Sequence, residues 1–312
     1  MKRLACSQSA LVLALTGALL ATSACLPKDT RPPPSRVLFT ATASPETKAG
    51  ALAQPTADGW DITFERVLVS LGRVSLDGDD CSVYSDPRYG RVLSLLGAPD
   101  AQKISESYAL GRCDFGFAIG NASSDSLLGV GATADDLAFL RTAGSDHYGG
   151  PSGISMFVSG RAHQADRTLT FAWAFRGRAR YRQCQTVLQD APQGGSLSLK
   201  QDGDVSLDVT LHAEALFAES ASDRNAALRF EPIAQADALG DGDGEVTLDE
   251  LRLVPLSELQ MDTAYADGGG DGGVGVWTTL EDFIYLGAAP NVAGFEETGK
   301  CMVALGNLRG ED

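Results

Sequence analysis

The sequence predicts a mainly β protein, either a β-sandwich or a partly closed barrel, with short C-terminal helices. Stretches in which apolar and polar residues alternate, such as Val205–Ala213, recur along the chain, and this period of two is typical of strands with one buried face. The 35 glycines and 13 prolines supply turns between them. Helical spacing is confined to short segments, so we expect a single β-rich domain over residues 37–312.

The predicted strands are best defined in the first half of the chain. Val37–Ala43 is a first strand, and Trp60–Leu76 is a second strand whose apolar positions change parity twice. A one-residue slip in an alternating pattern indicates a β-bulge, so we expect bulges near Glu65 and at Gly72. Cys113–Gly120 is a further strand.

Two hairpins are predicted in the second half. Gly153–His163 and Thr168–Cys184 alternate on either side of a polar turn at residues 164–167 and are expected to pair. Ser196–Lys200 and Val205–Ala213 are expected to form a second, shorter hairpin.

Two short helices are predicted from their first turns. Thr133–Leu140 begins with a threonine cap and has Asp136 three residues later. Thr278–Ala289 has Glu281 in the equivalent position, and Pro290 is expected to end it. Both pairs match the capping box, in which the two side chains satisfy backbone N–H groups that a helix leaves free.

The N-terminal residues have the pattern of a secretory signal peptide. A basic start is followed by the apolar run Ala10–Ala21 and by three small residues before Cys25. This stretch resembles the lipobox of bacterial lipoproteins, where a peptidase cuts before the cysteine and the thiol carries a diacylglycerol. The resemblance implies that residues 1–24 are a signal peptide and that Cys25 is lipidated. Thr22 stands where that family prefers leucine, so a plain signal peptide is the alternative.

We therefore expect a lipid-anchored protein of the bacterial cell envelope. Residues 25–36 contain three consecutive prolines, which favour an extended tether. Leu26 follows the lipidated cysteine, whereas the inner-membrane retention signal of the resembled pathway is an aspartate, so the outer membrane is favoured over the inner. No second apolar run in the sequence is long enough to span a bilayer.

The charge balance narrows the range of partners. The net charge is −16 and becomes −18 without the signal peptide, because Lys2 and Arg3 leave and no acidic residue does. Nucleic acid and anionic lipid surfaces attract basic proteins, so neither is expected as a partner bound through net charge.

Four cysteines remain in the predicted domain after Cys6 and Cys25 are accounted for. An even number in an oxidising compartment indicates two disulfides, with three connectivities open. Proximity in the sequence favours one pair between Cys81 and Cys113 and another between Cys184 and Cys301. A metal site is the alternative, but none of the four belongs to a CxxC pair.

Residues 237–251 (DALGDGDGEVTLDEL) resemble an EF-hand calcium loop aligned on Gly244. The first ligand position holds Leu239, so Asp237 can serve only if the loop bulges by two residues. A weak site, roughly 10⁻⁴–10⁻³ M, is expected because no paired loop is visible. The alternative is an acidic turn in which Thr247 and Glu250 cap a helix. The candidate ligands are Asp237, Asp241, Asp243, Glu245, Thr247 and Glu250.

Several stretches together resemble a family of uncharacterised bacterial surface lipoproteins. They are TLHAEALF (Thr210–Phe217), LRFEPIAQADA (Leu228–Ala238), the acidic loop and TLEDFIYLGAAPN (Thr279–Asn291). The resemblance covers most of the chain after the signal peptide and implies no particular activity.

Arg176, Arg178, Arg180 and Arg182 recur at every second residue. On a strand they would share one face over roughly 20 Å and could bind phosphates, a polyanionic glycan or carboxylates. The alternative is a solvated face whose arginines pair with carboxylates of this chain.

No catalytic residue is assigned. Ser145, Asp146 and His147 are adjacent in sequence, a spacing that rarely forms a triad, and the three histidines show no metal-ligand spacing. The predicted function is a non-enzymatic envelope protein that carries calcium and binds another envelope component, protein or glycan. The alternative is a secreted hydrolase of envelope glycans or esters, which would need paired carboxylates in a concave pocket.

Overall fold

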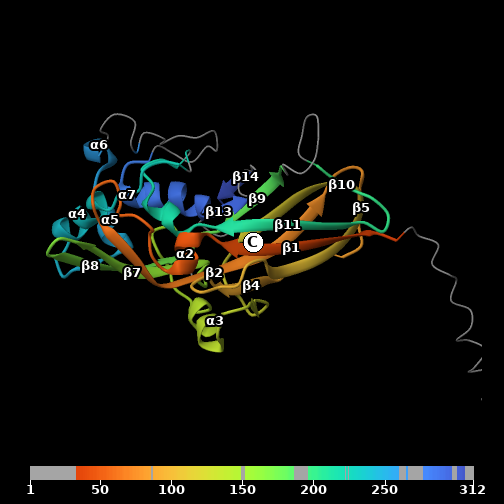
Figure 1. The fold of residues 1–312 in the computed structure, drawn as a ribbon, viewed down its shortest axis with the longest axis horizontal. Coiled ribbons are helices and arrows are strands. Elements are labelled where there is room, and N and C mark those ends of the chain that lie inside the picture. The colour runs from red at the N-terminus through yellow and green to blue at the C-terminus, as the bar shows by residue number, and fades with distance from the viewer. Residues whose placement is uncertain are drawn as a thin grey trace, which may run out of the picture. The chain divides into compact units, whose positions relative to one another are not determined.

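Two long, bent strands organise the fold of the computed structural model. They are β2 (Asp61–Asp77) and β5 (Gln102–Ile119), which pair with each other and with half of the other strands in the 14-stranded sheet that the described residues form. Its main path runs β12-β8-β7-β2-β5-β1-β11-β13, and the sheet curls into a half-barrel (Figure 1). The mainly β prediction is confirmed in its partly closed barrel form.

The structure describes residues 33–85, 87–148, 152–185, 196–221, 223, 225–259, 265, 277–296 and 301–305. The other strands are β1 (Ser35–Ala43), β3 (Cys81–Val83), β4 (Gly90–Ser94), β6 (Leu127–Leu128), β7 (Met156–Gln164), β8 (Arg167–Phe175), β9 (Ala179–Cys184), β10 (Leu197–Leu199), β11 (Asp204–Leu211), β12 (Glu245–Val246), β13 (Ala293–Phe295) and β14 (Met302–Leu305). The helices are α2 (Pro45–Ala49), α3 (Ala134–Leu140), η2 (Ala213–Phe217), α4 (Glu231–Leu239), α5 (Leu248–Leu251), α6 (Leu256–Leu259), α7 (Leu280–Asp282), η3 (Phe283–Ala288) and η4 (Ala289–Val292).

The predicted signal peptide, Cys25 and most of the predicted tether lie outside the described residues. The described tether ends earlier than predicted, since β1 begins at Ser35 and not at Val37. Residues Pro34–Asp312 form one unit by their internal contacts. Among the helices that the structure describes, none is both long and apolar enough to cross a membrane.

Both predicted bulges of β2 are confirmed. The register with β7 shifts between Phe64 and Arg66, and the register with β5 shifts between Gly72 and Ser75. Gly72 is required because a Cβ there would lie 2.5 Å from the Tyr89 carbonyl oxygen. The bulges bend the long strand and so let the sheet curl.

The second predicted hairpin is wrong. β10 pairs antiparallel with β5, whereas β11 pairs parallel with β1 and antiparallel with β13. Each segment therefore finds a partner far away in sequence. The first hairpin is confirmed over β7 and β8, which pair from Met156 with Phe175 to Gln164 with Arg167.

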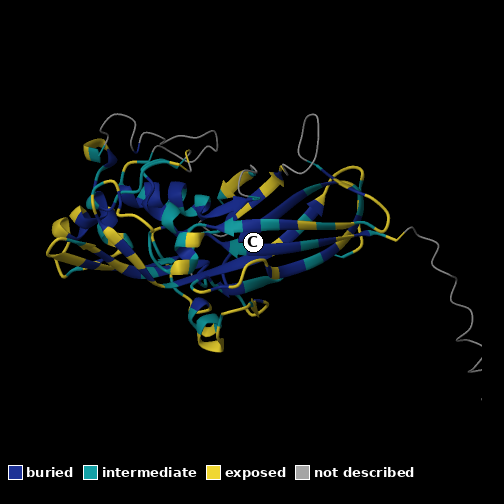
Figure 2. Ribbon diagram, viewed as in Figure 1, coloured by how far each residue is buried: buried dark blue, intermediate teal, exposed yellow. Residues whose placement is uncertain are grey.

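The concave interior of the sheet holds the main hydrophobic core (Figure 2). Trp173 and Phe115 are completely buried, and Phe117 stacks on Tyr181 with ring centroids 4.4 Å apart. The helical segment from α7 to η4 contributes Phe283, which is also buried. Burial of these large aromatic side chains, together with the aliphatic side chains around them, stabilises the fold.

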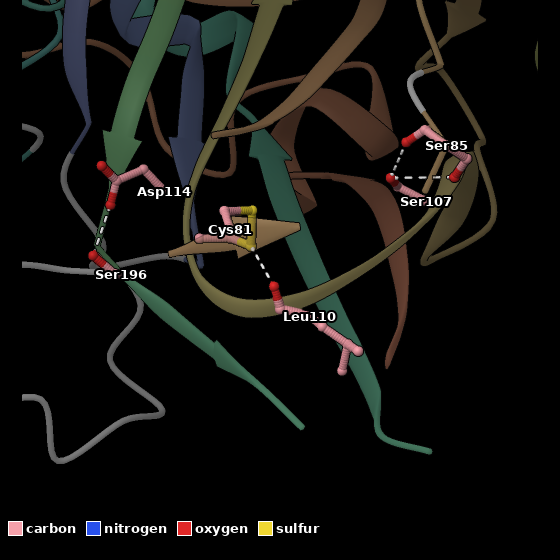
Figure 3. The surroundings of a disulfide bond; sticks show 7 residues. Cys81, Ser85, Ser107, Leu110, Asp114 and Ser196 are labelled. Carbon is pink, nitrogen blue, oxygen red and sulfur yellow. Dashed lines mark hydrogen bonds between the residues drawn. A yellow bond between two sulfur atoms is a disulfide. The ribbon is translucent and has the colours of Figure 1, made fainter. Parts of the chain in front are cut away.

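Both disulfides form as predicted. Cys81 is bonded to Cys113 across neighbouring strands, and Cys184 is bonded to Cys301 beside the β9–β14 pair. Around the first bond, the Cys113 Sγ lies 3.9 Å from the Leu110 carbonyl oxygen, and the Ser196 hydroxyl donates to Asp114 at 2.7 Å (Figure 3). The second bond attaches the C-terminal strand to the sheet.

The helix near the C-terminus differs from its prediction. Its capping box joins Thr279 to Asp282, one residue beyond the expected pair, and Glu281 is free to contact Arg252. The helix passes through π and 3₁₀ turns and continues past Pro290 to Val292. In contrast, the capping box of Thr133 and Asp136 is confirmed in α3.

Candidate functional site

The acidic loop lies between α4 and α5, next to strand β8 (Figure 1). Three of its carboxylates come together: oxygen atoms of Asp237, Asp241 and Glu250 all lie within 4.8 Å of one another. Asp237 is buried, Glu250 is partly buried and Asp241 is exposed. A group of this kind could hold a metal ion, since carboxylate oxygens are ligands for hard cations.

Asp237 is the member of this group that comes from helix α4. It lies in the last turn of α4, and its Oδ1 accepts the Gly244 N–H at 2.9 Å across the loop. Leu239, in the nominal first position, is 57% exposed. Asp237 thus joins the acidic group from the last turn of α4, two residues before Leu239.

Gly240 lets the third carboxylate approach. A Cβ at this position would lie 2.2 Å from Glu250 Oε1, so any larger residue would displace the Glu250 side chain. The same oxygen accepts the Asp241 N–H at 3.4 Å. Backbone and side chain thus close the loop around the three carboxylates.

The alternative interpretation of this stretch, a helix cap made by Thr247 and Glu250, is confirmed. Glu250 Oε2 accepts the N–H and the hydroxyl of Thr247 at 2.8 and 2.9 Å, and the Thr247 hydroxyl accepts the Glu250 N–H at 3.2 Å. This is the capping box of α5. Glu250 therefore caps the helix with one oxygen while its other oxygen faces the acidic group.

Asp243, the fourth carboxylate predicted as a ligand, is not part of this group, and Glu245 is expected to contribute its backbone carbonyl. Asp243 is exposed and accepts the Glu245 N–H at 2.8 Å, and the Glu245 side chain is exposed as well. The Gly244 carbonyl accepts the Thr170 N–H at 2.8 Å. Of the described acidic residues, only Asp237, Asp241 and Glu250 form a group that could hold a metal ion.

The loop is fixed to the rest of the molecule on two sides. β12 pairs in parallel with β8, and the buried Trp173 indole donates to the Val246 carbonyl at 2.9 Å. On the other side, Arg252 after α5 forms two hydrogen bonds to Glu281 of α7, at 2.8 and 3.2 Å. This buried carboxylate raises the pKa of Arg252.

The four predicted arginines do not form one continuous row. β8 ends at Phe175, and the Tyr285 hydroxyl accepts the N–H groups of Arg176 and Gly177 at 2.8 and 2.7 Å. The N–H groups of Arg176 and Gly177 therefore do not take part in strand pairing, and the extended segment is interrupted between β8 and β9. Arg176 Nη1 donates to the carbonyls of Thr142 and Ser152. Its side chain therefore joins the two ends of the segment between these residues.

The other three arginines line a hollow of about 780 Å³ beside β9. Arg180 and Arg182 alternate with the buried Ala179 and Tyr181, so they share the outer face of the strand as predicted. Arg178 precedes the strand, and its Nε donates to Asn121 at 2.7 Å.

Arg73 and Arg88 complete this hollow, which we call the arginine groove. Arg73 directly follows the Gly72 bulge and has a left-handed backbone, with φ of 49°. Neither residue was predicted from the sequence. The parity change at Gly72 is a signal for Arg73, because a bulge changes the direction of the next side chain; the irregular stretch that holds Arg88 offers none.

A second hollow, of about 700 Å³, is lined by the carboxylates Asp100, Asp208 and Glu296. Lys48 pairs with Asp100 at 2.8 Å, and Asp208 accepts hydrogen bonds from the hydroxyls of Thr40 and Thr42 at 2.6 and 3.2 Å. These carboxylates are the feature that the hydrolase alternative requires.

Asp146 belongs to a structural network and not to a triad with its neighbours. Its carboxylate accepts the Tyr285 hydroxyl at 2.6 Å, while His147 is exposed. Burial, reinforced by Asp146, raises the pKa of Tyr285. Next to it, burial disfavours ionised Asp282, but hydrogen bonds from Tyr148 and the threonine caps outweigh this and lower its pKa.

The histidines are separated in the fold. The His163 Nδ1 lies 3.0 Å from the Thr168 hydroxyl, and the His212 Nδ1 lies 2.9 Å from Glu214. Burial opposes ionisation of Glu214, but its hydrogen bonds, chiefly to His212, lower its pKa. Within the described part of the chain, no histidine joins a group that could hold a metal ion.

No protein-family model, curated protein or solved structure matches this chain in comparisons with known proteins.

Proposed function

We propose that this protein is a non-enzymatic, lipid-anchored component of the bacterial cell envelope that holds a calcium ion and binds another envelope component. The convergence of Asp237, Asp241 and Glu250 within 4.8 Å is the observation that supports this proposal most directly. Three oxygen donors with negative charge suit a hard divalent cation, and backbone carbonyls and water supply the remaining ligands of calcium.

A structural role for the ion follows from the position of the loop. Calcium would screen the mutual repulsion of the three carboxylates and so stabilise the junction of α4, β12 and α5. That junction contacts the central sheet through β8 and the C-terminal helix through Glu281. The ion is thus expected to raise global stability, without a part in catalysis.

Calcium at about ten times its Kd should raise the free energy of unfolding by about 1.4 kcal/mol, which corresponds to a rise of roughly 2–5 °C in Tm. Thermal unfolding of the purified protein at about 10 mM calcium, well above a weak extracellular site's Kd, measures this. Magnesium should substitute poorly, since it demands a tighter octahedral shell.

Two matched variants locate the effect. Glu250→Gln removes one charge from the converging carboxylates and should abolish the rise, while the exposed Glu245→Gln makes the same chemical change in the same loop and should keep it. An unchanged Tm for the natural protein, or equal losses in both variants, would contradict the calcium proposal.

The lipid anchor is tested by Cys25→Ser. Without the thiol no diacylglycerol can be attached, so the protein should move from the membrane fraction to the soluble fraction of a producing cell. Detergent should release the natural protein from the membrane fraction. Equal solubility of the two proteins would show that residues around Cys25 do not direct lipidation.

The hydrolase of envelope glycans or esters is the second candidate, and the hollow lined by Asp100, Asp208 and Glu296 favours it. Its carboxylates already accept hydrogen bonds from Lys48, Thr40 and Thr42, which is why binding is placed first. The test is an assay for hydrolysis of envelope polysaccharide or acyl ester by the natural protein and by Asp208→Asn. Hydrolysis by the natural protein that is lost in the variant would support the hydrolase and contradict the non-enzymatic proposal.

A further inference from the structure

The arginine groove concentrates positive charge in a protein that is strongly negative. Among the described residues, five arginines line it, namely Arg73, Arg88, Arg178, Arg180 and Arg182, together with one carboxylate, Asp77. The whole chain has a net charge of −16. The groove is therefore a local reversal of sign, and such a reversal attracts anions by focusing the field in a hollow.

Three of these arginine side chains have no polar partner among the described residues. Arg73, Arg180 and Arg182 make no side-chain hydrogen bond or ion pair with any residue that the structure describes, although the chain holds 41 acidic residues. Elsewhere exposed arginines do pair, as Arg36 does with Glu106 and Arg161 with Glu65. Among the residues that the structure describes, the alternative in which the arginines pair with carboxylates of this chain therefore does not hold for these three.

The backbone places these side chains around one space. Arg180 and Arg182 stand on β9, between β5 and β14. Across the groove floor, Gly116 lets β9 approach closely, since a Cβ there would lie 2.8 Å from the Tyr181 carbonyl oxygen. Arg73 reaches the groove from the β2 bulge, where its left-handed backbone redirects the side chain.

We propose that the arginine groove binds a small molecule or headgroup that carries two or more phosphate groups. A volume of about 780 Å³ is in the range of small-molecule sites. Phosphate carries more charge than a carboxylate and offers three acceptor oxygens, which match the planar donor forks of arginine. Arg180 and Arg182 are separated by roughly 6.6 Å along the strand, which suits more than one phosphate.

Two features set the limits of this ligand. Asp77 lines the groove and Asp125 lines a small neighbouring hollow shared with Arg73 and Arg88, so a ligand must place its phosphates toward the β9 side. The exposed Met302 and Val303 of β14 border the same groove. An apolar part of the ligand can therefore lie against β14.

The test is calorimetric titration of the purified protein with inositol hexakisphosphate at low and at high salt. Affinity should fall as salt rises, because arginine–phosphate attraction between exposed groups is screened. Arg180→Ala with Arg182→Ala should weaken binding by at least about tenfold, given the strength of charged hydrogen bonds. Arg180→Lys with Arg182→Lys should lose less, since it keeps the charge but not the forks.

The matched control is Arg36→Ala with Arg161→Ala, which lowers the net charge by the same two units outside the groove and should leave affinity within about twofold. A second experiment identifies the source of the phosphate groups. It compares binding of the protein to phosphatidylcholine vesicles with and without a diphosphorylated glycolipid. Retention on vesicles that contain the glycolipid indicates a lipid headgroup, whereas binding to the soluble polyphosphate alone indicates a free phosphorylated compound. Absence of binding, equal weakening by both double variants, or equal affinity for oligogalacturonate would overturn the proposal.

This inference deepens the proposed function, on which it rests for the idea of an envelope ligand. Its failure is distinguishable, because the calcium-dependent Tm and the membrane fractionation of Cys25→Ser do not involve the groove.

Discussion

Replacing Cys184 and Cys301 together with alanine is expected to lower the free energy of unfolding by about 4–5 kcal/mol. The bond joins residues 117 positions apart, and a cross-link that closes so long a loop removes much entropy from the unfolded chain. It also attaches β14 to β9, which it pairs with over four residues. Denaturant unfolding of both proteins, fitted to two states, measures the difference.

The matched comparison is Cys81→Ala with Cys113→Ala. This bond spans 32 positions, so its loss should cost about 3–4 kcal/mol, roughly 1 kcal/mol less than the longer loop. Both pairs have one completely buried partner, Cys113 and Cys184, which keeps the packing change similar. A larger loss for the shorter loop would show that local packing, and not chain entropy, decides the effect.

Arg252→Ala is expected to destabilise the protein by about 2–4 kcal/mol. Glu281 is only 2% exposed, and Arg252 is its ionic partner at 2.8 and 3.2 Å. Removing one member of a buried ion pair leaves the other charge unpaired and costs about 3–5 kcal/mol. We expect a smaller cost here because the Arg252 side chain is 40% exposed. Thermal and denaturant unfolding measure the loss.

A double-mutant cycle separates the charge from the packing. Adding Glu281→Gln to Arg252→Ala removes the unpaired charge and should recover at least about 1 kcal/mol. Arg252 also contacts Asp249, an exposed pair at 3.0 Å, so Asp249→Asn is the control and should cost less than about 1 kcal/mol. Additive losses across the cycle would mean that Glu281 does not depend on Arg252.

Local signals in the sequence determined much of the fold. The capping box of Thr133 and Asp136, the β2 bulges and the first hairpin all depend on residues within a few positions of one another. The acidic loop is similar, since Gly244 and the carboxylates around it lie within 14 residues. Proximity in the sequence also favoured the disulfide pairing that forms, although it left three connectivities open, because each bond joins cysteines that are neighbours in cysteine order.

Only the tertiary structure decided which distant segments meet. β11 pairs with β1 and not with β10, because strand alternation specifies a buried face but not the partner along its edge. The arginine row is interrupted by the hydroxyl of Tyr285, 109 residues beyond Arg176. Arg73 and Arg88 join the groove through a bulge and an irregular segment. Short-range chemistry thus specified the elements of this protein, while contacts between remote residues assembled its groove.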